Sequence, residues 1–281
     1  MNPADLLSAM KRTVEQLAAF EWASSQTSQG VRNLLRELEP GMTEQEAVRL
    51  LGWNGWPLSC HVMLTAGDRA RFGLLSPGDR PIQRGDPFTT AFGIWGALTC
   101  RAGFVVEDAD ELPDAIRDYV DRLVAPYFNA IAAWYAALHI GQTGGALQAI
   151  VDEHLGDPFF GIFLNPGHQL HLDEWVNSAI CPGPTVELQS GMCFQVDVIP
   201  ATGTEYFTSN IEDGIVLADA SLRGDFAERF PSAWSRIGRR REFMAMSLGI
   251  DLHPDVLPLS NLPAVLAPFI LRPDRAMAMV V

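Results

Sequence analysis

The chain has 281 residues, of which 48% are hydrophobic and 19% are charged, a composition typical of a globular protein with a substantial core. Its formal net charge of −14 would repel phosphate backbones and anionic membrane surfaces, and its longest basic run is Arg239-Arg240-Arg241. We therefore expect no nucleic-acid partner and no membrane association.

Four dispersed cysteines form no C-x-x-C pair, and the first eleven residues contain no apolar signal segment. We interpret the cysteines as small buried side chains with free thiols. Free thiols are typical of a reducing compartment, so we expect a cytoplasmic location. Residues 123–151 contain no charged residue, but Pro126, Asn129 and a Gly-Gly pair favour a buried helix over a membrane span.

The first half of the chain is predicted to form helices followed by strands. Apolar residues at helical spacing predict a helix from about residue 3 to 18 and another over residues 31–38. A capping box at Thr43-Glu44-Gln45-Glu46 opens a short helix that ends near Leu51. Residues 59–66 read as a strand carrying His61, and residues 88–95 and 97–106 as two strands joined at Gly96.

The second half repeats that order. A long helix over residues 116–138, kinked at Pro126, precedes a helix at 146–155 and a strand at 159–164. Residues 193–199 form a further strand, residues 205–208 are expected to pair with 214–218 around the Glu212-Asp213 step, and helices cover 221–248. The proline-rich tail, residues 251–281, is expected to wrap over the surface. The prediction is one α+β domain over residues 1–281, with halves of about 1–110 and 111–250 and no separate N-terminal domain.

Residues 165–175, Asn-Pro-Gly-His-Gln-Leu-His-Leu-Asp-Glu-Trp, gather two histidines, two acids and a tryptophan after a Pro-Gly turn. By itself this segment could be a solvated loop. Downstream, Asp197 lies on an apolar strand, where a buried carboxylate needs a partner, and Glu212 precedes another apolar run. Together with His168 they could form a proton-transfer site or a three-ligand metal site; a backbone or arginine partner and a turn cap are the alternatives.

Five segments occur in an order that resembles a known superfamily: Pro40-Gly41-Met42-Thr43, Gly85-Asp86, Gly167-His168, Gly191-Met192 and Glu212-Asp213-Gly214. The chain looks like the catalytic domain of the creatinase, proline-peptidase and methionine-aminopeptidase superfamily over nearly its whole length. The resemblance implies the pita-bread fold, in which helices flank a curved, mostly antiparallel sheet with two pseudo-twofold halves. It also implies a homodimer.

Metallopeptidases of this superfamily hold two divalent metals through two aspartates, one histidine and two glutamates. By the resemblance, the histidine falls on His168, the last glutamate on Glu212, and the other glutamate on Asp197. The first aspartate position matches Ala91, and the second falls among residues 97–100, which hold no carboxylate. The usual dinuclear site therefore cannot form, and we expect no metal and no cofactor.

Creatinase has this fold without a catalytic metal, so the resemblance implies a metal-independent hydrolase or lyase that acts on a C–N or similar bond of a small nitrogen-containing substrate or short peptide. His168 would be the acid/base, and Glu212 and Asp197 would hold a cationic nitrogen group. Substrate contacts are expected from His61, His171, Asp173, Glu174 and Trp175. The alternatives are an aminopeptidase with a mononuclear metal site, and a non-catalytic protein that binds peptides.

Overall fold

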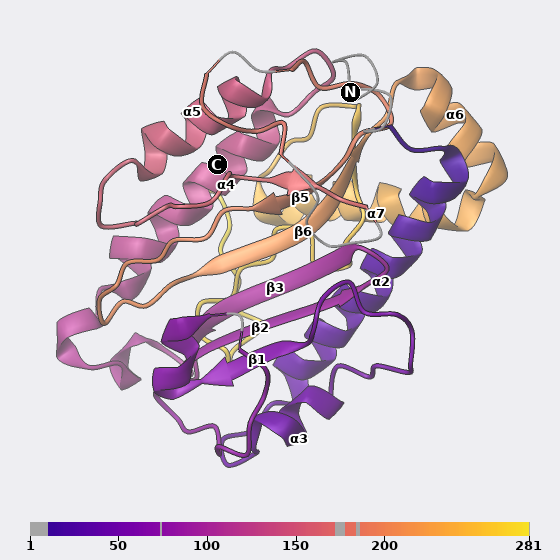
Figure 1. Ribbon diagram of the computed structural model, residues 1–281. Coiled ribbons are helices and arrows are strands. Elements are labelled where there is room, and N and C mark those ends of the chain that lie inside the picture. The colour runs from indigo at the N-terminus through magenta and orange to yellow at the C-terminus, as the bar shows by residue number, and fades with distance from the viewer. Residues whose placement is uncertain (1–10, 74, 172–177, 184–185, 281) are drawn as a thin grey trace.

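Seven antiparallel strands form one curled sheet in the computed structural model, which describes residues 11–280 except 74, 172–177 and 184–185 (Figure 1). The strand order is β1-β2-β3-β6-β5-β4, and β7 pairs with β6. The strands are β1 (Met63–Ala66), β2 (Pro87–Ile94), β3 (Ala97–Phe104), β4 (His168–Gln169), β5 (Cys193–Asp197), β6 (Asn210–Leu217) and β7 (Val256–Pro258). The α+β class predicted from the sequence is confirmed.

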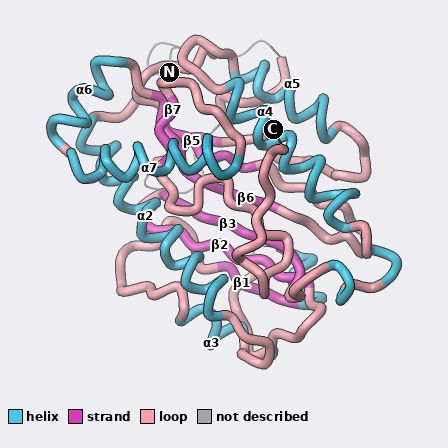
Figure 2. Tube along the Cα trace, turned by 180° about the vertical axis from the view of Figure 1, so that it is seen from behind, coloured by secondary structure: helices cyan, strands magenta, loops and turns pink. Residues whose placement is uncertain are grey.

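Helices flank this sheet, and in the view from behind α2 and α7 lie over its strands (Figure 2). Their bounds are α2 (Val14–Glu37), α3 (Glu44–Arg49), α4 (Ala125–Ala137), α5 (Gly144–Leu155), α6 (Ala220–Arg229) and α7 (Pro231–Leu248). The two helices expected at residues 3–18 and 31–38 are one helix, α2, within the described chain. A capping box between Thr13 and Gln16 fixes its start. None of the described helices is both long and apolar enough to cross a membrane.

The two halves repeat the same order of elements, as the sequence predicts. In each half a long helix and a shorter helix precede three strands: α2, α3, β1, β2 and β3 first, then α4, α5, β4, β5 and β6. Thr43 and Thr143 cap the shorter helices. Glycines with positive φ, Gly85 and Gly191, precede β2 and β5. In this internal repeat, β2 and β3 of the first half therefore correspond to β5 and β6 of the second.

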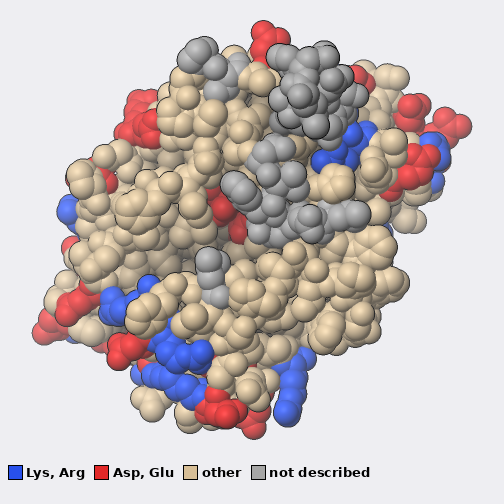
Figure 3. Space-filling view, in the orientation of Figure 1, with Lys and Arg blue, Asp and Glu red and all other residues tan. Residues whose placement is uncertain are grey.

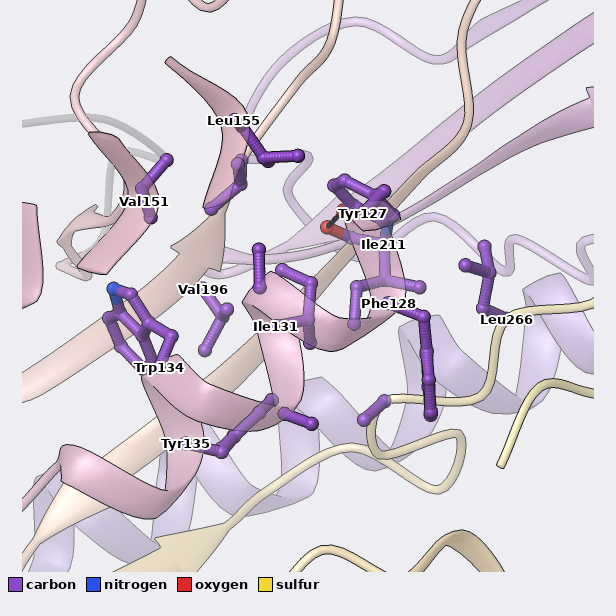
Figure 4. Close-up of a cluster of buried hydrophobic side chains, with 14 of the residues drawn as sticks. Tyr127, Phe128, Ile131, Trp134, Tyr135, Val151, Leu155, Val196, Ile211 and Leu266 are labelled. Carbon is purple, nitrogen blue, oxygen red and sulfur yellow. Dashed lines mark hydrogen bonds between the residues drawn. The ribbon is translucent and has the colours of Figure 1, made fainter. Parts of the chain in front are cut away.

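The largest group of buried side chains lies between α4 and the second half of the sheet (Figure 4). Trp134 and Tyr135 are fully buried, and α4 contributes them together with Tyr127, Phe128 and Ile131. The Tyr127 hydroxyl accepts a hydrogen bond of 2.9 Å from the backbone N–H of Ile211, so the helix also binds the strand by a polar contact. This packing holds β5 and β6 firmly beneath α4.

Several elements differ from the sequence-based expectation. The long helix is not uniform: a π-helical turn, Val120–Val124, leads directly into α4, and Pro126, which has no N–H to donate, lies in the first turn of α4. Residues 159–164 and 205–208 contain no strand. The tail does not simply lie on the surface, because β7 pairs with β6 and Leu257, Leu259 and Leu266 are buried.

Candidate functional site

Strand register brings four residues into one row across the middle of the sheet. Ala91 of β2 pairs with Cys100 of β3, Cys100 pairs with Glu212 of β6, and Glu212 pairs with Asp197 of β5. Ala91 and Asp197 stand six residues after the corresponding glycines of the internal repeat. The pair Ala91–Cys100 is therefore the first-half counterpart of Asp197–Glu212.

His168 enters beside this row from β4, where it pairs with Gln195 of the neighbouring strand. Gly167 precedes it with a φ of 128°, and a Cβ there would lie 3.0 Å from Ile180 and 3.1 Å from the carbonyl oxygen of Gln195. This close approach and the left-handed backbone require glycine, and together they fix the direction in which the chain enters β4.

The imidazole of His168 faces both carboxylates. Its Nε2 lies 3.2 Å from Oε1 of Glu212 and 3.8 Å from Oδ2 of Asp197. The three side chains are buried, with exposed fractions of 1%, 2% and 6% for His168, Glu212 and Asp197. Two carboxylates so close together, largely withdrawn from water, favour a neighbouring positive charge. The site is therefore suited to an imidazolium, a cationic substrate group or a metal cation.

Cys100 completes the row of polar side chains. Its Sγ lies 2.8 Å from Oε2 of Glu212, whose other oxygen, Oε1, faces His168. The thiol, 7% exposed, donates to a carboxylate that already faces an imidazole. Sequence reasoning missed Cys100 because a buried cysteine is ordinary in a core, and only the register of β3 against β6 identifies it.

On the other face of the same strands, Arg101 and Asp213 form a buried ion pair, in which Nη2 of Arg101 lies 2.9 and 3.1 Å from the two carboxylate oxygens. Burial raises the pKa of Asp213, and the positive charge of Arg101 opposes that shift. Because Arg101 follows Cys100 and Asp213 follows Glu212, this pair holds the two site strands together from behind.

On the N-terminal side of Cys100, β3 no longer pairs with β6, and the side chain of Gln195 reaches from β5 to β3. Nε2 of Gln195 donates a 2.9 Å hydrogen bond to the carbonyl oxygen of Leu98. The side chain passes Gly214, where a Cβ would lie 3.2 Å from Oε1 of Gln195 and 3.0 Å from the hydroxyl of Ser24. Glycine at this position leaves room for the bridge.

Apolar side chains surround Cys100 on the first-half side of the site: Met63, Ala91 and Leu98 are buried against it. In the space-filling view, acidic atoms appear in a hollow near the middle of the face, in the region of β5 and β6 (Figure 3). The site thus has an acidic part from the second half of the chain and an apolar part from the first half.

The donor set decides which cations fit. The two-metal site implied by the resemblance does not fit, because Ala91 has no donor atom and its neighbours Met63 and Leu98 are not ligands for hard cations. One cation does fit: His168, Asp197 and Glu212 each offer one ligand atom, and these atoms lie within 4.8 Å of one another.

The other predicted contacts are less closely tied to this centre. His61 lies two residues before β1 and is exposed, and His171 lies two residues after β4 and is partly buried. Both stay predictions as substrate contacts. Asp173, Glu174 and Trp175 lie outside the described residues.

Comparison with known proteins identifies the class of fold. A scan of family models and a search of curated proteins find no match. Among solved structures, the X-Pro aminopeptidase from Thermotoga maritima is 18% identical, with a TM-score of 0.62 over 75% of this chain and 60% of that protein. The prolidase from Pyrococcus furiosus is 18% identical, with a TM-score of 0.60 over 78% of this chain and 66% of that one.

The His243Ala variant of Escherichia coli aminopeptidase P is 14% identical, with a TM-score of 0.61 over 80% of this chain and 60% of that protein. This chain therefore spans between 60% and 66% of the length of these three structures. The similarity confirms the pita-bread fold that the sequence predicted: a curled antiparallel sheet, flanking helices and two related halves.

Proposed function

We propose that this protein is a hydrolase that cleaves a C–N bond in a small nitrogen-containing substrate or a short peptide, at the centre formed by His168, Asp197 and Glu212. The observation that carries the proposal is the buried imidazole whose Nε2 faces two buried carboxylates at 3.2 and 3.8 Å. A histidine in such surroundings is a natural acid/base, and the carboxylates favour a positively charged substrate group.

In the metal-independent form expected from the sequence, the substrate's cationic nitrogen group lies between Asp197 and Glu212. His168 takes a proton from water while the water oxygen bonds to the substrate carbon. His168 then delivers that proton to the leaving nitrogen as the C–N bond breaks. Nε2 takes that proton, and while it is protonated it donates a hydrogen bond to Oε1 of Glu212, 3.2 Å away, so the carboxylate stabilises the imidazolium.

The structural comparisons support a peptide or peptide-like substrate, since the similar structures carry the names prolidase, dipeptidase and X-Pro aminopeptidase. The acidic half of the site agrees with recognition of a free amino group. A homodimer and a cytoplasmic location stay predictions from the sequence.

A second form of the same hydrolase uses one divalent cation, and one observation favours it. The donor atoms of His168, Asp197 and Glu212 face one another rather than outward, within 4.8 Å, as ligands of a single ion do. A bound cation supplies Lewis-acid activation of the carbonyl under attack. In this form His168, Asp197 and Glu212 would hold the cation, and the apolar side chains around Ala91 would exclude water from the rest of the site.

The test combines His168→Ala and Glu212→Gln with a panel of amidines, amides and short peptides. We expect each variant to lose at least about 100-fold in kcat/KM, because general acid–base catalysis contributes roughly 100- to 10,000-fold. His154→Ala, an exposed histidine at the end of α5, is the matched control and should keep full activity. Metal analysis of protein purified without chelators separates the two forms.

Unchanged activity in His168→Ala would overturn the assignment of the centre. If the wild-type protein binds a short peptide but hydrolyses no member of the panel, the protein is a peptide-binding module, and the hydrolase proposal is wrong.

A further inference from the structure

Exposed tryptophans gather at the turn that joins β2 to β3. Trp53, Trp56 and Trp95 are 52%, 42% and 38% exposed. The ring of Trp56 packs edge-on against Trp95, with a centroid distance of 6.3 Å, and against the partly buried Trp22 of α2, at 5.1 Å. Nε1 of Trp53 donates a 2.7 Å hydrogen bond to the carbonyl oxygen of Trp56. Scattered apolar side chains are ordinary on a surface, but a connected group of them marks a binding surface. We call these four residues the tryptophan cluster.

The backbone at Trp95 adopts an unfavourable conformation. Trp95 and Gly96 form the two-residue turn of the hairpin, with φ angles of 54° and 86°. Asn, Asp and Gly are the usual residues in a turn of this kind, and a bulky side chain at positive φ is strained. The hydroxyl of Ser59 accepts a 2.8 Å hydrogen bond from the N–H of Gly96 and donates to the carbonyl oxygen of Ala97 at 3.0 Å, so the turn is held firmly. A strained residue that is held in place in this way points to a functional role for its side chain.

An uncharged strip joins the tryptophan cluster to the candidate site. Leu98 and Cys100 of β3 lie between the two, and the partly buried Cys60 packs against the same apolar group. Gly96 precedes Cys100 by four residues, and Cys100 pairs with Glu212 on the neighbouring strand. With about 3.3 Å per residue along a strand and about 4.8 Å between strands, the turn lies about 14 Å from Glu212. In the space-filling view, the surface beside the acidic hollow is largely uncharged in the region of β2 and β3 (Figure 3).

We infer that the tryptophan cluster binds an apolar side chain of a peptide whose free amino end lies between Asp197 and Glu212. The peptide lies extended over the uncharged strip, at about 3.3 Å per residue, so its fourth or fifth residue reaches the tryptophans. The inference deepens the proposed function and rests on it for the place of the amino end. It names the substrate class: peptides of at least four or five residues with an aromatic or aliphatic side chain at that distance from the amino end.

Charge and shape favour such a peptide over other ligands of an aromatic surface. Asp197 and Glu212 attract a protonated amino group, whereas the net charge of −14 repels the phosphates of a single-stranded nucleic acid, whose bases could otherwise stack on tryptophan. Large apolar side chains gain most from burial against indole rings. The rings already contact one another, so little side-chain freedom is lost when the peptide binds.

Calorimetric titration of full-length His168→Ala, chosen to prevent cleavage during the measurement, tests the inference with C-terminally amidated peptides. We expect Ala-Ala-Ala-Phe-Phe to bind at least about 10-fold more tightly than Ala-Ala-Ala-Ser-Ser, because burial of one large apolar side chain corresponds to about that factor or more. Acetylation of the amino end should also weaken binding, because it removes the positive charge that Asp197 and Glu212 attract.

Trp95→Asn, made in the same background, removes the indole and places at the turn a residue that tolerates positive φ. It should abolish the preference for the phenylalanine peptide and leave the melting temperature unchanged or higher. Trp234→Phe is the matched control, because Trp234 lies on α7 and packs against a different apolar cluster, and it should keep the preference.

A preference that survives in Trp95→Asn would overturn the inference, and so would equal binding of the two peptides by the parent protein. Self-association that Trp95→Asn abolishes, without any peptide preference, would instead make the cluster an interface between copies of this chain. The inference and the proposed function fail separately. Trp95-dependent binding without cleavage by the wild type would leave the inference standing and the hydrolase wrong, whereas cleavage without the preference would do the reverse.

Discussion

Individual cysteines in this protein occupy different environments. Cys193 is fully buried, and burial raises the pKa of its thiol to about 12. Cys60 and Cys181 are only partly buried. Since the thiolate is the reactive form of cysteine, these differences in exposure and pKa should appear as differences in alkylation rate.

At pH 8 the Cys193 thiol would be ionised in only about one molecule in ten thousand, given its raised pKa. We therefore predict that iodoacetamide modifies Cys60 and Cys181 of the folded protein first, and Cys193 only after unfolding. Peptide mass spectrometry after timed labelling measures the order, and labelling in denaturant, where all four cysteines react, is the control. Equal rates at Cys193 and Cys60 in the folded protein would contradict the burial of Cys193.

The sequence predicted three candidate site residues because each breaks a local pattern. Asp197 is a carboxylate within an apolar run, Glu212 precedes an apolar run, and His168 follows a Pro-Gly turn. Cys100 breaks no pattern, since a small sulfur side chain is common in a core. Its closeness to Glu212 depends on the pairing of β3 with β6, which are more than 100 residues apart, and no local signal records such a pairing.

At the scale of elements, a buried ion cluster joins α2 to α7. Glu21 of α2 is fully buried and accepts hydrogen bonds from Arg240 at 2.7 Å, from Arg236 at 2.9 Å and from Ser25 at 3.1 Å. Arg240 also donates to Asn261, so the C-terminal segment is tied to the same cluster. Burial lowers the pKa of Arg240, which Glu21 counteracts.

We predict that Glu21→Gln lowers the free energy of unfolding by about 3–5 kcal/mol, because it leaves two guanidinium groups partly buried without their counter-charge. Urea denaturation followed by circular dichroism measures the change. Glu15→Gln is the matched control, since Glu15 lies on the same helix and pairs with Arg229 on the exposed surface. Equal effects of the two substitutions would show that the buried cluster contributes no more than a surface pair.

The helices were easier to predict than one strand, and β6 shows why. The capping box at residues 43–46 and the repeating apolar pattern of residues 221–248 are local signals, and α3, α6 and α7 confirm them. The Glu212-Asp213 step reads as a turn because adjacent carboxylates normally face water. In the structure each has its own partner on opposite faces of a continuous strand, Glu212 with His168 and Asp213 with Arg101.

At the scale of the whole molecule, the two repeated halves of the sheet meet at a narrow seam. Within the described chain, β3 and β6 pair at three positions, residues 100–102 with 210–212, whereas β2 and β3 pair at eight. Arg101 reinforces the seam, donating to Asp213 and to the carbonyl oxygens of Leu262 and Val265 at 2.5 and 2.8 Å. The C-terminal segment thereby contributes to the join.

We predict that Arg101→Met lowers the free energy of unfolding by about 3–5 kcal/mol, because Asp213 would stay buried without its counter-charge. The double variant Arg101→Met/Asp213→Leu should recover part of that loss, since it removes both charges together. Arg84→Met, which removes an exposed arginine that pairs with Glu107 and Glu111, is the surface control.

Hydrogen exchange distinguishes weakening of the seam from general destabilisation. In Arg101→Met, amides of residues 100–102 and 210–212 should exchange faster than those of the β2–β3 hairpin, because the seam has fewer strand pairs to hold it closed. Since Cys100 and Glu212 form one of those pairs, the same variant should also lower kcat/KM at the candidate site. Uniform acceleration of exchange across the sheet, with activity unchanged, would show that the seam is not the weak point and that Arg101 does not position the site.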